Sequence, residues 1–412
     1  MVKCKTFEIK HGGRYVEERI KQISFLKALS FFHIGGKATI LPFLPLFLHI
    51  KGFSSVEIGT VMGVAPLISI AAQPIIGFIS DKYKTVKRIL IFLYFGVIAS
   101  SFGVFFHDSF LVVFLSFLLF HFALSPCTPL IDSMSLKSLG ANKHEYGKIR
   151  LWGSLGFFFI AFVSSPILQS IGIERLFFPF LVTILLTLIV LSFLRDQDTS
   201  SAPVNLKSIG EILKNRLFMS FLLLCLLVLI PHRINDMMIV LHLESLGATT
   251  FWIGLAWSLA ALSEVPVFYY LAKKIKAFDE LFLLSIVAAL YTIRWLLYGF
   301  ISSPSIVTFL QVSQGITFGL FWLIAMQMAV RTVPDHLRST GQALLTSICF
   351  GVGGAIGGTG GGWTLDHLGS QTLYQLMAGM TFAASVLIFL FYRYNQMKHT
   401  APHAQKKLWT NR

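Results

Sequence analysis

The sequence predicts an all-α membrane protein, with twelve transmembrane helices arranged in two pseudo-symmetric bundles of six. The chain of 412 residues is 55% hydrophobic and only 13% charged, whereas soluble domains carry about 25% charged residues. Twelve apolar stretches are long enough to cross a bilayer, which requires about 20 residues each. Features of the first half of the chain also recur in the second half. We therefore expect the lipid bilayer to cover much of the surface.

The predicted spans follow one another through short connections, except at the middle of the chain. They cover residues 23–49, 56–79, 89–106, 110–136, 151–169, 176–194, 217–243, 251–272, 280–301, 305–330, 340–362 and 372–392. The longest hydrophilic connection follows the sixth span. We therefore expect an N-terminal bundle of residues 1–195, a cytoplasmic linker of residues 196–216 and a C-terminal bundle of residues 217–412.

The basic residues predict the orientation, because Lys and Arg concentrate in the short cytoplasmic loops of membrane proteins. With the N-terminus inside, 28 of the 34 Lys and Arg residues fall in cytoplasmic segments, 2 in outside loops and 4 within spans. We expect a multi-pass, monomeric protein of the cell (inner) membrane with both termini in the cytoplasm and no cleaved signal peptide. The net charge of +15 does not indicate a nucleic-acid partner, because the basic residues form short clusters between apolar stretches.

A repeat supports the division into two halves. An interval of seven residues separates Gly52 from Gly59 after the first span, and the same interval separates Gly247 from Gly254 after the seventh span. Parallel repeats of six helices are typical of secondary transporters.

A charged motif follows the second span. It reads Gly-Phe-Ile-Ser-Asp-Lys-Tyr-Lys-Thr-Val-Lys-Arg and contains Gly77, Asp81, Lys82 and Arg88. We expect Gly77 to allow close helix approach, and Asp81 to pair with a basic residue at a neighbouring helix end in one gate state. The alternative is a basic loop that only sets the topology. This motif resembles the signature of the major facilitator superfamily.

Three further segments are similar to the lactose permease and phenylpropionate permease group of that superfamily. They cover residues 41–46, 145–156 and 334–342. The resemblance implies a secondary transporter that moves a small organic solute by alternating access. It also implies that Arg150 contacts the solute, that Asp132 pairs with Arg150, and that Arg294 lies in the cavity.

The sequence departs from this group at two important places. Phe157 stands where the lactose permease stacks its sugar on a tryptophan. Gln314 and Thr317 stand where it has a His and a Glu for proton coupling. We therefore do not expect lactose as the solute, and proton coupling must use other residues or be absent.

Several ionisable residues lie within the predicted spans, where a charge costs roughly 2.5–3.5 kcal/mol by insertion scales. They are Lys37, Asp132, His232, Arg233, Asp236, Glu264 and Arg294. His33 and Lys37 are four residues apart and therefore share a helix face. We expect these groups to line a cavity. The alternative is that pairs such as Arg233–Asp236 and Glu264–Arg294 are static struts.

Glu264 is the first choice for a coupling carboxylate. A group that exchanges protons needs a pKa near the working pH, and Arg294 on the next helix offers a partner that binds and releases Glu264. We expect Asp132 to stay ionised beside Arg150.

The glycine-rich run from Gly351 to Gly362 lacks the features of a nucleotide-binding loop. Its small-xxx-small spacing predicts close helix packing in lipid instead. The four cysteines predict neither a disulfide framework nor a zinc site. We expect no cofactor, no metal and no enzyme activity.

Proton-coupled uptake of a sugar, nucleoside or aromatic acid is the first hypothesis for function. The second is a drug or metabolite efflux antiporter, although the fifth span lacks the glycine–proline motif typical of drug antiporters. The third is a non-transporting membrane receptor or scaffold. The ionisable residues within the spans argue against it, because a scaffold gains nothing from the cost of burying them. The excess of cationic over acidic cavity candidates favours a neutral or anionic solute.

Overall fold

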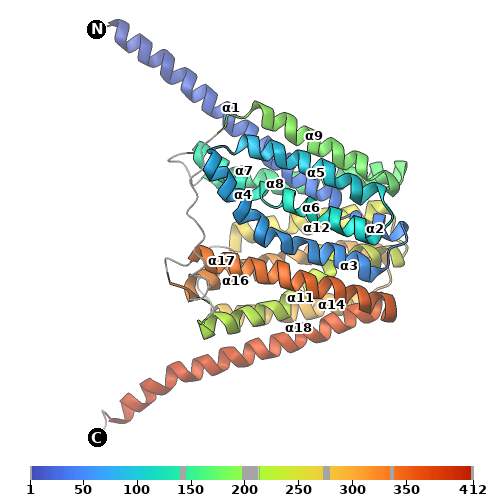
Figure 1. The fold of residues 1–412 in the computed structure, drawn as a ribbon. Coiled ribbons are helices and arrows are strands. Elements are labelled where there is room, and N and C mark those ends of the chain that lie inside the picture. The colour runs from blue at the N-terminus through green and yellow to red at the C-terminus, as the bar shows by residue number, and fades with distance from the viewer. Residues whose placement is uncertain are drawn as a thin grey trace. The chain divides into compact units, whose positions relative to one another are not determined.

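A computed structural model describes residues 2–139, 145–196, 212, 214–271, 279–334 and 338–409 (Figure 1). This part of the chain is almost entirely helical and contains no strand. The all-α prediction is therefore confirmed. Helices suit a bilayer because they satisfy every backbone polar group within one segment.

The first half of the chain forms nine α-helices within the described ranges. They are α1 (Val2–Ile40), α2 (Leu44–Ile50), α3 (Ser55–Val64), α4 (Ser69–Tyr83), α5 (Lys87–Phe106), α6 (Phe110–Leu124), α7 (Cys127–Leu139), α8 (Tyr146–Ile171) and α9 (Phe177–Phe193). Two short 3-10 turns, η1 (Ala65–Ile68) and η3 (Ile173–Arg175), precede α4 and α9.

The second half contains seven α-helices in the part that the structure describes. They are α11 (Arg216–Ser245), α12 (Thr250–Pro266), α14 (Glu280–Phe300), α15 (Pro304–Leu310), α16 (Leu320–Thr332), α17 (Arg338–Thr346) and α18 (Gly353–Trp409). Short segments of other helix types lie between them: the π-helices η4 (Val267–Leu271), η7 (Gly315–Gly319) and η9 (Ser347–Val352), and the 3-10 helix η6 (Gln311–Ser313).

Local sequence explains where several helices begin and break. The side chain of Asn215 accepts from the backbone N–H of Phe218 and caps α11, and Asp279 caps α14 in the same way. Such caps satisfy donors that a helix start leaves open. Pro42 lies between α1 and α2, and Pro126 lies between α6 and α7, because proline lacks the N–H that a continuous helix needs.

Eleven helical segments of the described residues are long and apolar enough to cross a membrane. The first ten coincide with the first ten predicted spans. The predicted spans 340–362 and 372–392 both fall within the eleventh segment, Thr340–Gln396. Gly369 interrupts this segment with non-helical angles of φ 79° and ψ 167°, a conformation that glycine tolerates because it has no β-carbon.

Contacts divide the chain into two compact units. Unit 1 comprises Met1–Phe53, Val64–Val204 and Ala248–Ser258, and unit 2 comprises Ser54–Gly63, Asn205–Gly247 and Leu259–Arg412. In unit 1, α1 packs against α8 and α9, and α5 packs against α6 and α9. In unit 2, α11 and α14 both pack along α18 (Figure 1). Each candidate site described below lies within a single unit.

The glycine-rich run packs closely against two helices of unit 2, as predicted. A β-carbon built on Gly358 would lie 2.1 Å from the carbonyl oxygen of Gly59 in α3. On the adjacent side of α18, a β-carbon on Gly357 would lie 3.1 Å from the carbonyl oxygen of Ile230 in α11. At the end of this contact, the Asp366 carboxylate accepts from the first backbone N–H groups of α3. Small residues permit such approach between backbones, and glycine, which has no β-carbon, permits the closest.

Gly358→Ala is expected to destabilise the protein by about 1–3 kcal/mol, the usual cost of overpacking a well-packed contact. The matched control is Gly360→Ala in the same helix, because a β-carbon there would meet no atom within 4 Å. Thermal unfolding can be followed with a maleimide dye that reacts with the buried thiols of Cys127, Cys225 and Cys349. Equal midpoints for the two variants would contradict the close contact.

Candidate functional site

A chain of polar side chains crosses α1, α5 and α7 in unit 1. The ring of buried His33 places Nε2 2.8 Å from Oγ1 of Thr128 and Nδ1 2.8 Å from Oη of Tyr94. One turn after His33, the Nζ of Lys37 donates to the same Thr128 Oγ1 at 2.7 Å. In the described part of the chain, no carboxylate lies at ion-pair distance from Lys37. The shared face that we expected for His33 and Lys37 is confirmed.

Asp132 and Arg150 lie close to this chain of side chains. Asp132 is one turn beyond Thr128 in α7, and its Oδ1 lies 3.6 Å from Nη1 of Arg150 in α8. The side chain of Arg150 is 47% exposed and that of Asp132 is 31% exposed. Exposed pairs contribute only about 0–1 kcal/mol, so a solute can replace either partner at little cost. The ion pair implied by the family resemblance is present in this structure.

Phe157 is half-buried in α8. Its ring centroid lies 6.1 Å from that of Trp257, and it packs against a small apolar cluster of Ala38, Ile160 and Ala161. These contacts explain its position by packing alone. Its role in stacking on a solute stays a prediction.

Arg294 in α14 is the central buried cation of unit 2. It is only 3% exposed, and it donates to Gln314 Oε1 at 2.6 Å, Thr317 Oγ1 at 2.9 Å and Gln311 Oε1 at 2.5 Å. Its Nε also donates to Tyr298 Oη at 3.2 Å. Every one of these acceptors is a neutral oxygen. Within the described ranges, no carboxylate pairs directly with this guanidinium.

Aromatic rings complete the surroundings of the guanidinium. Its central carbon lies 4.9 Å from the ring centroid of Trp295 and 5.4 Å from that of Tyr298. Nearby, the hydroxyl of Tyr291 and the Nε1 of Trp295 are buried and have no hydrogen-bond partner among the described residues. Buried polar groups of this kind are normally satisfied by ordered water.

Gln314 connects Arg294 to Glu264. The Gln314 Nε2 donates to Glu264 Oε1 at 3.4 Å, while its Oε1 accepts from the arginine. The direct Glu264–Arg294 strut that we weighed is therefore wrong for this structure. The amide lies between the two charges because it has both a donor and an acceptor. In the sequence, Gln314 stands out only as a replacement for a coupling residue, and nothing there indicates this bridging position.

Asp236 in α11 pairs within its own helix. Its Oδ2 lies 2.6 Å from Nη1 of Arg233 and 3.5 Å from Nε2 of His232. The Arg233–Asp236 strut is therefore present. Arg233 also lies over the ring of Phe350 at 5.3 Å, so the pair is held from two sides.

The charged motif after the second span lies at a tight turn between α4 and α5. Lys84 has a left-handed conformation with φ 48°. Asp196, after α9, accepts from the hydroxyl of Thr85 and from the backbone N–H groups of Val86 and Lys87 at 3.0 and 2.9 Å. The Lys87 ammonium in turn donates to the Ser192 and Leu194 carbonyls. No motif in the sequence indicates this anchor, because Asp196 lies in a hydrophilic connection between spans.

The structural reason that we gave for Gly77 is wrong. A β-carbon built there would meet no described atom within 4 Å, so this glycine serves no close helix contact in this structure. Lys82 and Arg88 are exposed, and Asp81 is half-exposed in the last turn of α4. The gating role of these four residues stays a prediction. Residues 197–211 and 213 of the expected linker and residues 335–337 lie outside the described residues.

Two substitutions are expected to separate the anchor from the gate. Asp196→Ala removes a helix cap that contributes about 0.5–2 kcal/mol, and should lower the thermal midpoint by a few degrees. Asp81→Asn should keep expression and slow turnover, because it removes the charge of the motif without removing this cap. Unfolding curves and initial transport rates measure the two effects. Wild-type turnover in Asp81→Asn would leave the motif with only a topological role.

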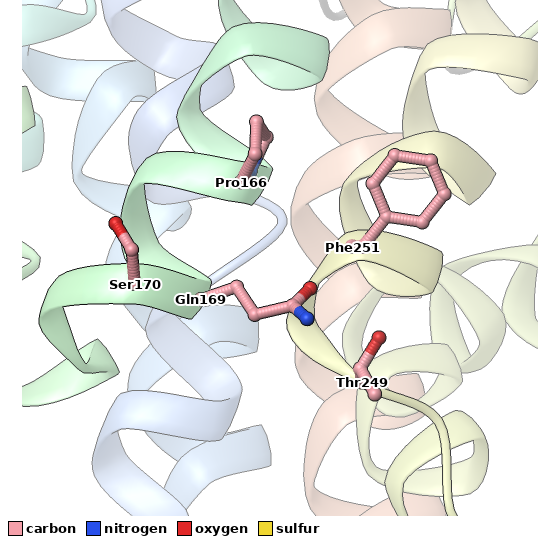
Figure 2. A pocket seen from close by; sticks show the side chains of 5 residues that line it. All are labelled: Pro166, Gln169, Ser170, Thr249 and Phe251. Atoms are coloured by element: carbon pink, nitrogen blue, oxygen red, sulfur yellow. The ribbon is translucent and has the colours of Figure 1, made fainter.

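A separate shallow cavity of about 520 Å³ lies in unit 1 between the end of α8 and the start of α12 (Figure 2). Pro166, Gln169, Ser170, Thr249 and Phe251 line it. In Figure 2 the Gln169 side chain extends from α8 towards the start of α12. The lining has no ionisable side chain and none of the predicted site residues, so we place the candidate site around Thr128 in unit 1 and Arg294 in unit 2.

Known proteins are similar to this chain over most of its length. Residues 23–376 match the model of a family described as the MFS_1 like family. The maltose permease of Geobacillus stearothermophilus is 29% identical over 367 residues, which cover 88% of this chain and 92% of that protein. The uncharacterized transporter YwbF of Bacillus subtilis is 26% identical over 382 residues, which cover 91% and 94%.

A solved structure shows a similar fold. The crystal structure of the nucleoside transporter NupG has a TM-score of 0.77 and 19% sequence identity, and the match covers 90% of this chain and 99% of that chain.

Proposed function

Since the chain belongs to the MFS_1 like family and is a multi-pass membrane transporter of small solutes, we propose that it takes up a neutral, polyhydroxylated solute together with protons by alternating access. The observation that carries this proposal is the buried network in which Gln314 joins Arg294 to Glu264.

The proposed architecture is two pseudo-symmetric six-helix bundles, residues 1–195 and 217–412, joined by a cytoplasmic linker of residues 196–216. The interruption at Gly369 supports a count of twelve spans. We propose a monomer in the cell (inner) membrane with both termini in the cytoplasm.

Reporter fusions test this orientation. They should read outside at Lys51, Ser303 and Gln371, and inside at Lys84, Ser201 and Lys276. One robust inversion would overturn this orientation.

Glu264 is the proposed proton carrier. Hydrogen bonds to a charged group are roughly twice as strong as neutral ones, so the Gln314 amide binds the ionised Glu264 more firmly than the protonated form. Protonation therefore loosens the bond from Gln314 Nε2. The same amide holds Arg294 through Oε1. A change in the protonation of Glu264 therefore affects the buried guanidinium of Arg294 through the Gln314 amide. No direct ion pair between Glu264 and Arg294 is needed.

The solute class follows from the acceptors around Arg294. Gln311, Gln314 and Thr317 are neutral, and all three are at least 90% buried. Amides and hydroxyls both donate and accept, which suits the hydroxyl groups of sugars and nucleosides. The maltose permease and the nucleoside transporter NupG are named for solutes of this type. An efflux antiporter is the alternative, and the direction of transport distinguishes it.

Uptake into proteoliposomes tests the proposal. Radiolabelled maltose and uridine should be accumulated above equilibrium when a proton gradient is directed inward, and a protonophore should abolish the accumulation. Transport that a protonophore leaves unchanged would indicate a facilitator or another coupling ion. Export of the solute that is driven by proton entry would favour the efflux alternative. Failure to bind or transport either probe would overturn the proposed solute class.

A further inference from the structure

The hydroxyl of Thr128 is shared by two side chains of α1. Lys37 Nζ lies 2.7 Å from it, and His33 Nε2 lies 2.8 Å from it. An ammonium group is only a donor, so Lys37 must donate to the Thr128 oxygen. The role of His33 depends on which ring nitrogen carries the proton.

Tyr94 decides between the two tautomers of His33. The side chain of Tyr94 is 0% exposed, and its hydroxyl has one hydrogen-bond contact in the described part of the chain, to His33 Nδ1 at 2.8 Å. A buried hydroxyl that finds no acceptor costs about 1–3 kcal/mol. The Tyr94 O–H therefore donates to Nδ1, and the proton of the neutral imidazole is on Nε2. A doubly protonated ring is excluded for the same reason, because its Nδ1 would carry a hydrogen and could not accept from the Tyr94 hydroxyl.

The Nε2–H of His33 then donates to Thr128. The Thr128 oxygen has two lone pairs, and these accept from His33 and Lys37. The hydroxyl hydrogen of Thr128 is left over. No further hydrogen bond of Thr128 exists among the described residues, so this hydrogen is free to donate to another group.

The arrangement runs from the buried interior of unit 1 to a more open position. Tyr94 and His33 are buried, whereas Thr128 and Lys37 are half-buried. At the open end lie the free Thr128 O–H and two unused N–H donors of the Lys37 ammonium. Thr128 and Lys37 therefore present donors at this end, and the Asp132 carboxylate one turn further along α7 lies beside Arg150.

We propose that Thr128 donates a hydrogen bond to an acceptor oxygen of the transported solute, and that Tyr94 positions this donor by fixing the tautomer of His33. The inference rests on the proposed function for the identity of the solute, a sugar or nucleoside hydroxyl oxygen. The titratable and charged groups that act on His33 are Lys37 on α1, Tyr94 on α5 and Arg150 on α8. Cys127 and Asp132 on α7 lie near Lys37.

The first test reads the tautomer directly. Solid-state nitrogen NMR of the histidine-labelled full chain in lipid distinguishes protonated from unprotonated ring nitrogens, and the His33→Gln variant assigns the signal. The wild-type protein should carry the His33 proton on Nε2. In Tyr94→Phe the tyrosine donor is absent, and a second signal from the Nδ1–H tautomer should appear. A wild-type ring protonated on Nδ1, or on both nitrogens, would overturn the inference whatever solute is transported.

The second test measures binding of maltose and uridine to the same variants. Thr128→Val should weaken binding of the transported probe about tenfold, the effect of one lost hydrogen bond, and Thr128→Ser should restore it. Tyr94→Phe should also weaken binding, although Tyr94 touches no solute. The double variant should be no weaker than Thr128→Val alone, because both changes remove the same donor.

A matched control uses another hydroxyl of unit 1. Thr187 bonds only the carbonyl of Thr183 in its own helix, and Thr187→Val should leave binding unchanged. Wild-type affinity in Thr128→Val, or strictly additive effects of the two substitutions, would overturn the inference while leaving the proposed function intact. Absence of binding in the wild-type protein would overturn the proposed solute class instead.

Singly deoxygenated analogues identify the oxygen that accepts. If uridine is the probe, either the 2′- or the 3′-deoxy analogue should bind the wild-type protein weakly and show no further loss in Thr128→Val. An equal loss for every analogue in both proteins would overturn the proposed contact.

Discussion

Glu264→Gln is expected to abolish accumulation of the solute against its gradient while leaving solute exchange intact. The glutamine keeps an oxygen that accepts from Gln314 Nε2, so the geometry around Arg294 is preserved. It cannot take up or release a proton at the working pH, so net proton movement stops. Exchange requires no net proton movement and should continue at a similar rate.

Proteoliposomes loaded with unlabelled solute measure exchange, and an imposed proton gradient measures accumulation. The control is Glu57→Gln, because Glu57 only caps a local turn at Ser54. Should Glu264→Gln still accumulate the solute, Glu264 is a structural group and the proton is carried elsewhere. Should the wild-type protein ignore the proton gradient, the coupling hypothesis itself fails.

Arg294→Lys should reduce the transport rate at least about a hundredfold. Lysine keeps the positive charge, but it lacks the planar set of five donors that reaches Gln311, Gln314 and Thr317 together. Each hydrogen bond to a charged group contributes about 1.5–3 kcal/mol, and about 1.4 kcal/mol corresponds to a factor of ten. Losing two of these bonds therefore predicts the stated reduction.

Initial rates of uptake measure the effect, with the amount of folded protein determined in parallel. Arg331→Lys is the matched control. Arg331 also donates hydrogen bonds, in its case to the carboxylate of Glu280, but its own side chain is 72% exposed. Wild-type transport in Arg294→Lys would show that charge alone is sufficient and that the directed hydrogen bonds to the two glutamines are not required.

The helices were predictable from the sequence because the bilayer imposes a length and an apolar composition on each span. The close packing of the glycine-rich run was predictable for a similar reason, since small residues in lipid have few other uses. Charged residues such as Lys37 and Arg294 were found because ionisable groups are rare in spans. In each case the bilayer restricts which residues a span tolerates, so an exception can be recognised in the sequence.

The polar contacts themselves were not predictable. Thr128 and Tyr94 are uncharged residues in apolar helices, and nothing in their spacing indicates that they meet at His33. The bridge through Gln314 depends on where an amide of α15–η7 lies relative to α12, which is a property of tertiary packing. For the same reason the direct Glu264–Arg294 pair was wrong, and so was the close contact expected of Gly77.

The glycine face of α18 has a consequence for how the chain is assembled in the membrane. A helix with many glycines gains little from its own side chains, since each glycine in a helix interior costs about 1 kcal/mol relative to alanine. This helix is stabilised by close packing against neighbouring backbones. One of these neighbours is the segment of residues 54–63, near the beginning of the chain. Biosynthesis delivers that partner early and α18 late. A C-terminal fragment starting at Asn205 would lack the surface that covers Gly354, Gly358 and Gly362, so the second half of the chain depends on the first for its own completion.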